Sequence, residues 1–573
     1  MSYTAPVTEQ RFVLETIADL PGLAKLPQFA AASPDMVDAI LTEAAKLAET
    51  VFAPLNKLGD QQGAIWADGV VTLPTGFREA YRQFVDGGWG SLGADPAHGG
   101  QGLPFVLASA VQEQLTSANM AFSLCMMLTQ GAIEAVQAHG SDSQKAEYLT
   151  KMVSGEWTGT MNLTEPQAGS DVGALRSRAE PRGDGSYRIQ GSKIFITWGE
   201  HDCADNIVHL VLARLPDAPA GTKGISLFLV PKILPDGSRN DLKCASIEHK
   251  LGIHASPTCT MAFGDGGACV GWLIGAEGAG MRAMFTMMNH ARINVGLQGV
   301  AIAERATQGA VAYARERVQS GKIIAHADVR RMLMTMRATT EAVRALTYYN
   351  AAAVDRGHAG NAESRRLADL LTPVTKAYAT DTGVEMASLG VQVFGGMGFI
   401  EETGAAQHLR DARIAPIYEG TNGIQAMDLV ARKLPQGAWK DLFADMRADI
   451  AMLPADGDLG ALKPYLDDGL GALETATVWM VGNQGESQRE AAAGAVPYLR
   501  MFGIVVGGWL LAKQAVAAAR GVDGYDPAFL RAKIISARFF AEQVVPQAVA
   551  LLGPATRGSE LFYALEENQF AAA

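Results

Sequence analysis

Cysteine is scarce in this sequence, and the few cysteines form no pattern. Five occur among 573 residues, with no Cys-x-x-Cys pair and no cluster of His and Cys at metal-ligand spacing. This excludes the common zinc modules and a disulfide framework, and it favours a reducing, cytoplasmic location.

An excess of positive charge is also missing. The chain has 48 Lys and Arg against 60 Asp and Glu, a net charge of −12, which disfavours nucleic acid and anionic membranes as general partners. The N-terminal residues show no basic-then-apolar signal pattern, and the longest apolar run near the C-terminus, Met501 to Ala512, is too short to span a bilayer. We therefore expect no nucleic-acid partner and no membrane span, although a small basic site for a phosphate is still compatible with this composition.

Apolar residues, in contrast, suffice for several cores. Hydrophobic residues make up 48% of the chain and charged residues 19%, which is typical of a globular protein, and the length fits about three or four domains. The motif Ser33-Pro34-Asp35 has the pattern of a helix start. Further helix is predicted over residues 76–86 and 105–139.

The periodicity then changes twice. Short β-branched or apolar runs between residues 187 and 230, separated by turn signals, predict a compact β domain. Helical spacing returns after residue 280, where Pro373 is expected to kink or break a helix. We predict an α+β fold that consists of a leader (1–33), an N-terminal helical domain (34–157), a central β-barrel-like domain (158–280), a four-helix-bundle domain (281–435) and a C-terminal helical extension (436–573).

The most informative stretch is Ala-Pro-Ile-Tyr-Glu-Gly-Thr-Asn-Gly-Ile-Gln at residues 415–425. Its single carboxylate, Glu419, follows Pro416 and precedes the glycines Gly420 and Gly423, a composition that favours a loop over a helix. A carboxylate among apolar neighbours on such a loop can be desolvated, which raises its pKa toward neutrality and suits it to act as a general base. For this stretch alone, a surface loop glutamate is the alternative interpretation.

Two further stretches could face a ligand. The segment Met-Asn-Leu-Thr-Glu-Pro-Gln-Ala-Gly-Ser-Asp offers Thr164 and Ser170 as hydroxyl donors, and Gly169 lets the backbone approach a bound molecule; a plain polar turn is the alternative. Phe195 and Thr197 occupy alternate positions of one predicted strand, so a ring and a hydroxyl point the same way. Such a face suits a flat heterocycle, whereas packing of the ring in the core is the alternative.

Two turns could contact phosphate or nucleotide groups. Residues 316–322 are interpreted as the end of a helix with Gly321 as its C-cap, where Arg317 could pair with a phosphate; a solvated helix end is the alternative. Residues 390–399 form a glycine-rich turn after a helix, which on its own is weak evidence for a nucleotide contact.

Taken together, these stretches resemble the acyl-CoA dehydrogenase family. The motifs, in the family's order and spacing, are Thr-Glu-Pro-x-Ala-Gly-Ser-Asp (164–171), Lys-Ile-Phe-Ile-Thr (193–197), Lys-Leu-Gly-Ile-His-Ala-Ser-Pro-Thr (250–258), Gln-Val-Phe-Gly-Gly-Met-Gly-Phe (392–399) and Ile-Tyr-Glu-Gly-Thr-Asn-Gly-Ile-Gln (417–425). The resemblance covers about residues 36 to 435. The helical tail and the form of the third motif resemble the longer bacterial branch that includes 3-methylmercaptopropionyl-CoA dehydrogenases.

The resemblance implies an FAD enzyme that converts an acyl-CoA thioester, fatty or 3-methylmercaptopropionyl-like, to the trans-2-enoyl-CoA and passes electrons to an electron-transferring flavoprotein. Glu419 matches the base that takes the α-proton while a hydride leaves the β-carbon for flavin N5. The backbone N–H of Glu419, with a ribityl hydroxyl, would stabilise charge on the thioester oxygen. An acyl-CoA oxidase that uses oxygen is one alternative. A DNA-binding relative with little dehydrogenase activity is another, and the net charge of −12 argues against it.

The family match also implies three groups of binding residues. Those on the substrate side are Ser170, Asn289, Arg292 and Gly420. Those around FAD in the same subunit are Met161, Leu163, Thr164, Gly169, Ser170, Phe195, Thr197, Thr421 and Gly423. Those that contact the FAD of a neighbouring subunit are Arg317, Gln319, Gln392, Gly395 and Gly396. FAD would then bridge two subunits, so the protein is expected to be a homo-oligomer, a dimer or a tetramer.

The sequence departs from the family pattern at several of these positions. Met161 stands where many members have an aromatic residue, Phe195 where many have Trp, and Ser320 where an adenine-stacking Phe is usual. Some members place the base on a helix, one residue before the arginine. That position is Ala291 here, so Glu419 has no competitor for the role.

Overall fold

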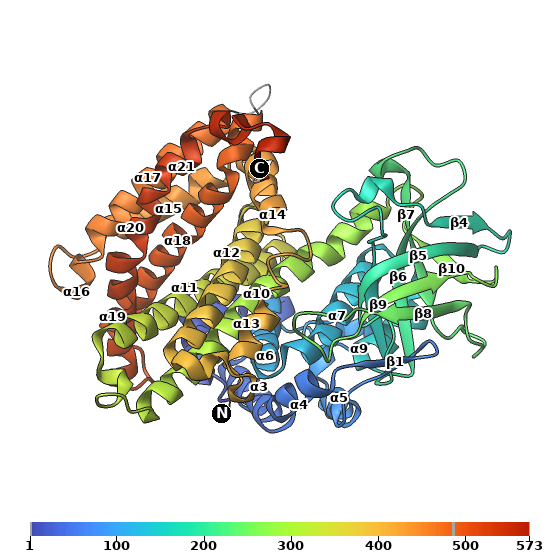
Figure 1. Cartoon of the computed structure of the whole chain (residues 1–573), viewed down its shortest axis with the longest axis horizontal. Coiled ribbons are helices and arrows are strands. Elements are labelled where there is room, and N and C mark those ends of the chain that lie inside the picture. Colours follow the sequence, from blue (N-terminus) through green and yellow to red (C-terminus); the bar gives the residue numbers. More distant parts are fainter. Residues whose placement is uncertain (1–2, 484–487, 572–573) are drawn as a thin grey trace.

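The structure is a computed structural model that describes residues 3–483 and 488–571, apart from the side chain of Asn289. Its elements follow the predicted order of helices, β domain, long helices and helical extension (Figure 1), which confirms the α+β fold class. The N-terminal helices include α1 (Val7–Thr16), α3 (Pro34–Leu47), α4 (Ala53–Gln62), α5 (Phe77–Asp86), α6 (Phe105–Ala118), α7 (Met120–His139) and α9 (Thr150–Ser154).

Local capping signals explain where the N-terminal helices begin and end. Helix α3 begins as predicted, with Ser33 as N-cap and Pro34 in the first turn. The helix expected over residues 105–139 is instead two helices, because Asn119 has an extended backbone and its side chain accepts a hydrogen bond of 3.1 Å from the N–H of Phe122. The leader is itself folded, since α1 buries Phe12 and its neighbours in the core.

The β domain closes on itself. Its strands are β3 (Trp157–Asn162), β4 (Arg178–Pro181), β5 (Tyr187–Thr197), β6 (Asn206–Arg214), β7 (Ile225–Pro231), β8 (Leu242–Ile247), β9 (Thr258–Phe263) and β10 (Val270–Ile274). Strand β10 pairs antiparallel with both β7 and β5, while β6 and β4 connect those two strands on the other side. The result is the barrel-like arrangement on the right of Figure 1.

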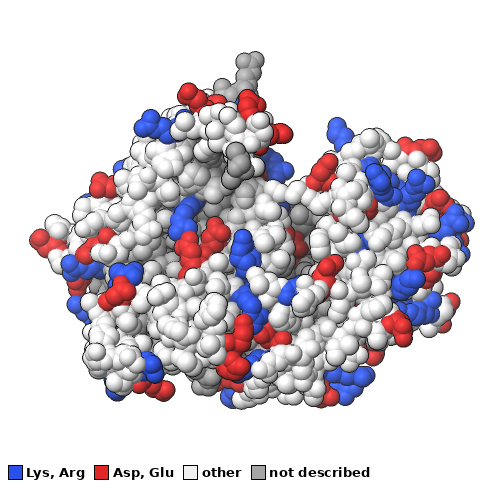
Figure 2. Space-filling view, in the orientation of Figure 1, with Lys and Arg blue, Asp and Glu red and all other residues white. Residues whose placement is uncertain are grey.

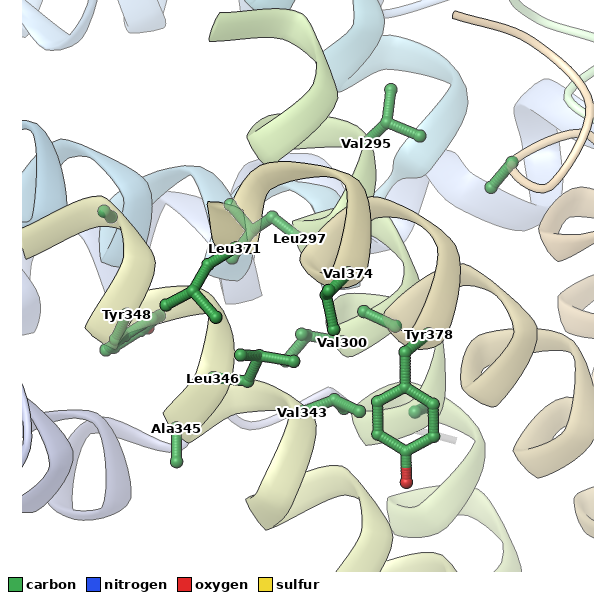
Figure 3. Packing of buried hydrophobic residues seen from close by; sticks show 14 of the residues in the cluster. Val295, Leu297, Val300, Val343, Ala345, Leu346, Tyr348, Leu371, Val374 and Tyr378 are labelled. Atoms are coloured by element: carbon green, nitrogen blue, oxygen red, sulfur yellow. The ribbon is translucent and has the colours of Figure 1, made fainter. Parts of the chain in front are cut away.

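Three long helices follow the β domain: α10 (Gly280–Glu316), α11 (Ala327–His358) and α12 (Ala362–Phe394). Apolar side chains from all three meet in one core, as Figure 3 shows for Val300, Leu346 and Val374. A fourth long helix, α18 (Gln488–Arg520), packs on α11 and α12, although it belongs to the extension. At Gly503 a Cβ atom would stand 2.4 Å from the ring of Tyr378, so α18 approaches α12 this closely only because it has glycine there.

Two predictions for this region need correction. Of the two effects expected of Pro373, a kink or a break, the break does not occur, because α12 continues through it from Ala362 to Phe394. Gly321 does not cap α10, which ends five residues earlier at Glu316. Gly321 instead lies, with φ of +106°, in a tight turn in which Val318 and Lys322 pair.

The extension consists of α15 (Ala438–Ala451), α17 (Lys463–Gly482), α18, α19 (Pro527–Gln543), α20 (Val545–Ala550), α21 (Leu552–Thr556) and shorter turns. Within the described residues, α18 is the one helix long and apolar enough to cross a membrane by length and composition, and 83% of its most apolar window is buried inside the protein. It is therefore a core helix, as expected for its run of apolar residues.

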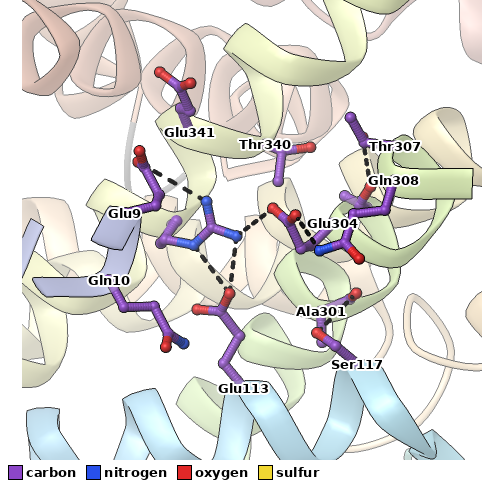
Figure 4. Close-up of polar contacts among 12 residues, drawn as sticks. Glu9, Gln10, Glu113, Ser117, Ala301, Glu304, Thr307, Gln308, Thr340 and Glu341 are labelled. Atoms are coloured by element: carbon purple, nitrogen blue, oxygen red, sulfur yellow. Dashed lines mark hydrogen bonds and ion pairs between the residues drawn. The ribbon is translucent and has the colours of Figure 1, made fainter. Parts of the chain in front are cut away.

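Ion pairs in the interior connect α1, near the N-terminus, and α19, in the extension, to the bundle. The guanidinium of Arg344 in α11 forms ion pairs with Glu113 in α6 at 2.9 Å and Glu304 in α10 at 2.6 Å, and it approaches Glu9 in α1 to 3.9 Å (Figure 4). Lys533 in α19 pairs with the same Glu9 at 2.7 Å. Arg344, Glu113 and Lys533 are buried and Glu9 and Glu304 partly buried, so these ion pairs join the leader and the extension to the bundle in the interior of the protein.

Candidate active site

Glu419 lies in the segment between α13 (Ala405–Ala412) and α14 (Asn422–Asp428), on the side of the bundle that faces the β domain (Figure 1). Its backbone is left-handed, with φ of +54°, and Gly420 follows with φ of +85°. The N–H of Asn422 closes the segment by donating to the carbonyl of Pro416 at 3.0 Å. A non-glycine residue holds such a backbone only where its surroundings fix it, which is common at functional sites.

The predicted loop is shorter than expected. The hydroxyl of Thr421 accepts a hydrogen bond of 3.2 Å from the N–H of Ile424 and so caps α14. Gly423 therefore lies in the first turn of a helix, and the prediction of a loop throughout residues 415–425 is wrong from Asn422 onward.

The carboxylate of Glu419 lies in surroundings that shift its pKa upward. Burial raises its pKa to about 7, against the opposing influence of the positive charges of Arg292 and Lys376. Both the protonated and the ionised forms are then populated near neutral pH, so this group can accept a proton and release it again.

Arg292, in α10, lies beside this loop. Its Nη2 atom is 3.8 Å from the point where a Cβ atom on Gly420 would stand. The side chain is buried and approaches Asp428 to 3.5 Å, while its Nε has no hydrogen-bond partner in the described structure. A buried donor without an acceptor is unfavourable, so this position suits a bound molecule that brings an acceptor.

The strand face at Phe195 is shaped by a bulge. The pairing of β5 with β9 shifts register between Lys193 and Ile196, and Phe195 takes a φ of +59° there. Phe195 is 57% exposed, which excludes the alternative that it packs in the core. The N–H of Ile194 donates to the carbonyl of Thr164 at 2.9 Å, which joins this strand to the segment after β3.

Of the other residues expected around FAD in the same subunit, Leu163 and Thr164 are joined to this strand, since the ammonium of Lys193 also donates to the carbonyl of Leu163 at 3.1 Å. Met161, at the end of β3, is partly accessible, as are Leu163, Thr164 and Thr197, and Gly169 and Ser170 are exposed. The surface is hollowed between the helical part and the β domain (Figure 2). The side chain of Asn289, expected on the substrate side, lies outside the part of the chain that the structure describes.

The residues expected to contact the FAD of a neighbouring subunit gather elsewhere. Tyr313, one turn before Arg317, stacks on Phe394, directly before Gly395, with ring centroids 4.2 Å apart. Arg317, Gln319, Gln392, Gly395 and Gly396 are all exposed at this end of the bundle. Lys376, which contacts the Glu419 loop, precedes Phe394 by 18 positions along α12, a distance of about 27 Å at 1.5 Å per residue. The structure therefore does not bring this group to Glu419 within one chain.

Sequence reasoning missed two residues that contact the loop. Lys376 donates from its ammonium to the carbonyl of Gly420, and Gln298 accepts from the hydroxyl of Tyr418. Gln298 interrupts an apolar stretch of α10, and Lys376 is the one charged residue of α12 between Asp369 and Asp381. These two features were the available signal, because neither residue belongs to a recognised motif.

Four family models match consecutive parts of the chain. They are described as the acyl-CoA dehydrogenase N-terminal domain (residues 37–156), middle domain (160–265) and C-terminal domain (278–434), followed by an acetyl-CoA dehydrogenase C-terminal-like domain (442–566).

Two curated relatives match almost the whole chain. The 3-methylmercaptopropionyl-CoA dehydrogenase of Ruegeria pomeroyi is 46% identical over 96% of this chain and 97% of its own length. A butyryl-CoA dehydrogenase of Syntrophomonas wolfei is 37% identical over 89% of this chain and 90% of its own.

Solved structures share the fold over a similar extent. Caenorhabditis elegans ACDH-11 in complex with C11-CoA has a TM-score of 0.79 at 21% identity and covers 95% of this chain and 92% of its own. An acyl-CoA dehydrogenase complexed with FAD from Bacillus anthracis has a TM-score of 0.76 at 19% identity and covers 94% of this chain and 90% of its own.

Proposed function

Because the chain belongs to the acyl-CoA dehydrogenase family, we propose that it oxidises an acyl-CoA to the trans-2-enoyl-CoA with Glu419 as the base. The raised pKa of this carboxylate, together with its left-handed loop facing the β domain, carries the proposal. Removing an α-proton requires a base that is ionised but has a high affinity for a proton. A carboxylate with a pKa of about 7 meets both requirements at neutral pH.

Other groups of the chain would stabilise the developing negative charge and bind the substrate. The backbone N–H of Glu419 would donate to the thioester oxygen as negative charge develops there. Arg292, Gly420 and Ser170 would bind the substrate, and Asn289 is placed there by the family match alone. The closeness of Arg292 to the loop and its unpaired Nε support its role.

FAD is the cofactor of this family, and it would supply the acceptor for the β-hydride. The residues present fit it: an exposed aromatic ring at Phe195 with the hydroxyl of Thr197 on the same strand suits a flat heterocycle. The other cofactor residues of the same subunit would be Met161, Leu163, Thr164, Gly169, Ser170, Thr421 and Gly423. Of these, Thr421 also caps α14, so its hydroxyl has a structural task as well.

The protein would act as a homo-oligomer in which each FAD touches two chains. The supporting observation is the separation of about 27 Å along α12 between the Glu419 loop and the end that carries Gly395. Arg317, Gln319, Gln392, Gly395 and Gly396 would therefore serve the FAD of a partner. Nearby exposed apolar side chains, Val318, Met397 and Phe399, suit burial at such a contact.

The preferred substrate would have a short acyl group, and 3-methylmercaptopropionyl-CoA is the first candidate. Both reported relatives are named for short acyl groups, and the one named for the thioether is the more similar of the two. Electrons would pass to an electron-transferring flavoprotein. The five cysteines are free thiols in the structure, which suits the proposed cytoplasmic location.

The two alternatives have little support. An oxidase reaction requires that oxygen reoxidise the flavin quickly, whereas both relatives are named dehydrogenases. A DNA-binding function requires a basic face, but acidic and basic side chains alternate over the face shown in Figure 2.

Anaerobic titration of the purified protein with acyl-CoAs tests the proposal. The panel is 3-methylmercaptopropionyl-, butyryl-, octanoyl- and palmitoyl-CoA, and the readout is flavin absorbance at roughly 450 nm. We expect bleaching by the two short substrates. An FAD-containing protein that none of them reduces would contradict the proposed reaction. Admitting air after reduction then separates the two acceptors, since a dehydrogenase reoxidises slowly until the flavoprotein partner is added.

A further inference from the structure

Lys376 occupies an unusual position in the bundle. It lies on α12 three residues after Pro373, and its side chain is fully buried. The ammonium donates to the carbonyl oxygen of Gly420 at 2.8 Å and to the side-chain oxygen of Asn422 at 2.9 Å. Both acceptors are uncharged and both belong to the segment that carries Glu419.

A buried ammonium held only by neutral acceptors is unfavourable for folding. Moving such a charge out of water costs several kcal/mol unless it gains strong compensating contacts. The pKa of Lys376 reflects this, since burial lowers it to about 7 against the opposing effect of the nearby carboxylates Glu419 and Asp381. A methionine would fill the same volume without this cost, so packing alone does not explain why a charged residue occupies this position.

The contacts of Lys376 with the loop that carries Glu419 explain the presence of the charge. Glu419 and Gly420 both have left-handed backbones, and the Gly420 carbonyl accepts from the ammonium and, at 3.3 Å, from the amide of Gln425. Asn422 is in turn bound to α12, where its amide donates to the carbonyl of Ala377 at 3.1 Å. Gly420 and Asn422, one and three residues after the base, are therefore both fixed to α12.

Charged side chains from three helices lie around Glu419. Arg292 reaches it from α10 and Lys376 from α12, and both lower the pKa of Glu419. Asp381, on α12, and Asp428, on α14, face these two cations rather than the base. Without Lys376, Arg292 would be the remaining cation among the described residues that lowers the pKa of Glu419, and it is already shared with Asp428.

We propose that Lys376 is a positioning residue for the dehydrogenation: its ammonium holds the loop that carries Glu419, and its charge stabilises the ionised form of that base. This inference rests on the proposed function, because Lys376 has this role only if Glu419 is the group that takes the proton.

The test compares variants by the pH dependence of flavin reduction. Lys376→Met removes both the hydrogen bonds and the charge, and Lys376→Gln keeps a hydrogen-bond donor without the charge. Thr380→Val is the matched control, because the Thr380 hydroxyl contacts Asn422 from the same helix, at 3.3 Å, without any charge. Each holoenzyme is mixed anaerobically with excess acyl-CoA in a stopped-flow instrument at pH values from 5.5 to 9.

For Lys376→Met we expect the midpoint of the pH profile to rise by at least about half a pH unit, and the limiting rate to fall about tenfold or more because the base is misplaced. Lys376→Gln should show the same shift of midpoint with a smaller loss of rate, and it carries the test if the Met variant does not fold. Thr380→Val should keep the wild-type midpoint.

Two results would overturn the inference. An unchanged midpoint in both Lys376 variants would show that the charge does not act on the base, whatever happens to the rate. A wild-type enzyme that holds FAD but is not reduced by acyl-CoA would refute the proposed function, and this inference with it. The wild-type trace is recorded in the same series, so the two failures are told apart.

Discussion

The carboxylate of Asp411, near the end of α13, accepts a hydrogen bond of 2.5 Å from the backbone N–H of Ile253 in the β domain. Both residues are buried. The contact joins the helix that leads to Glu419 to the domain that carries Phe195, and it therefore fixes the proposed base relative to the proposed flavin face.

Replacing Asp411 by alanine should loosen this connection. We expect the variant to lose about 1–3 kcal/mol of stability, since a buried N–H is left without an acceptor. Flavin reduction should slow about tenfold or more through misplacement of Glu419. Asp411→Asn is the control, because its side-chain oxygen can still accept the hydrogen bond. Melting temperature and anaerobic stopped-flow rates measure the two effects, and a full rate in the alanine variant would show that this contact does not position the base.

Glu419→Gln should abolish turnover while leaving the site assembled. The amide keeps the size of the side chain but cannot accept the α-proton, so we expect flavin reduction to slow by at least about a thousandfold. FAD content and the affinity for acyl-CoA, measured by absorbance and by calorimetry, should stay near the wild-type values. Glu402→Gln, at an exposed glutamate, is the control for a nonspecific effect of losing one carboxylate. Retained turnover in Glu419→Gln would mean that another group is the base.

The rate of flavin reduction should depend on pH with a midpoint near 7. Burial raises the pKa of Glu419 to about 7 from an ordinary value of 4.5, and only the ionised form can take a proton. The rate should therefore be low at pH 5.5, rise through neutrality and level off above about pH 8. Single-turnover reduction at limiting substrate reports the free enzyme. A profile already flat at pH 5.5 would indicate that this carboxylate is not desolvated in solution.

The buried ion cluster around Arg344 should dominate the stability of the bundle. Arg344→Met would leave Glu113 and Glu304 facing one another without their shared cation, at a cost of about 3–5 kcal/mol. Arg331→Met is the matched control, since Arg331 pairs with Asp328 on the surface and such pairs contribute about 0–1 kcal/mol. Thermal unfolding measures both. Adding Glu113→Gln to Arg344→Met should recover part of the loss, and equal melting temperatures for the two single variants would contradict the assignment.

How far the sequence predicts this molecule depends on whether a signal is local. The cap at Ser33 and the glycines around Glu419 act on their own neighbours, so the helix start and the first part of the loop could be predicted. The bulge at Phe195 depends on pairing with β9, more than 60 residues away. The alternation of side chains along one strand therefore does not predict it. Lys376 meets Gly420 across 44 residues, and no spacing rule connects them.

The order of the elements was also easier to predict than their partners. The sequence predicts a helical extension over residues 436–573, but it does not say which surface a helix there, such as α18, covers. The close approach of Gly503 to Tyr378 shows that this helix of the extension completes the bundle. Amphipathic patterns define a buried face, whereas the choice between two apolar surfaces depends on shape complementarity that appears only in three dimensions.

Mixing two inactive variants tests whether each FAD is shared between chains. Arg317 lies at the far end of the bundle from Glu419, so Arg317→Glu should impair FAD binding at a partner's site, whereas Glu419→Gln impairs catalysis in its own chain. In an oligomer of one chain of each kind, one site would carry both defects and the other would carry none. We therefore expect co-expressed, doubly tagged oligomers to recover flavin reduction that neither variant shows alone. If FAD bound within a single chain, every site would keep one defect and the mixture would stay inactive, because no reassortment of chains could separate a residue from its own loop.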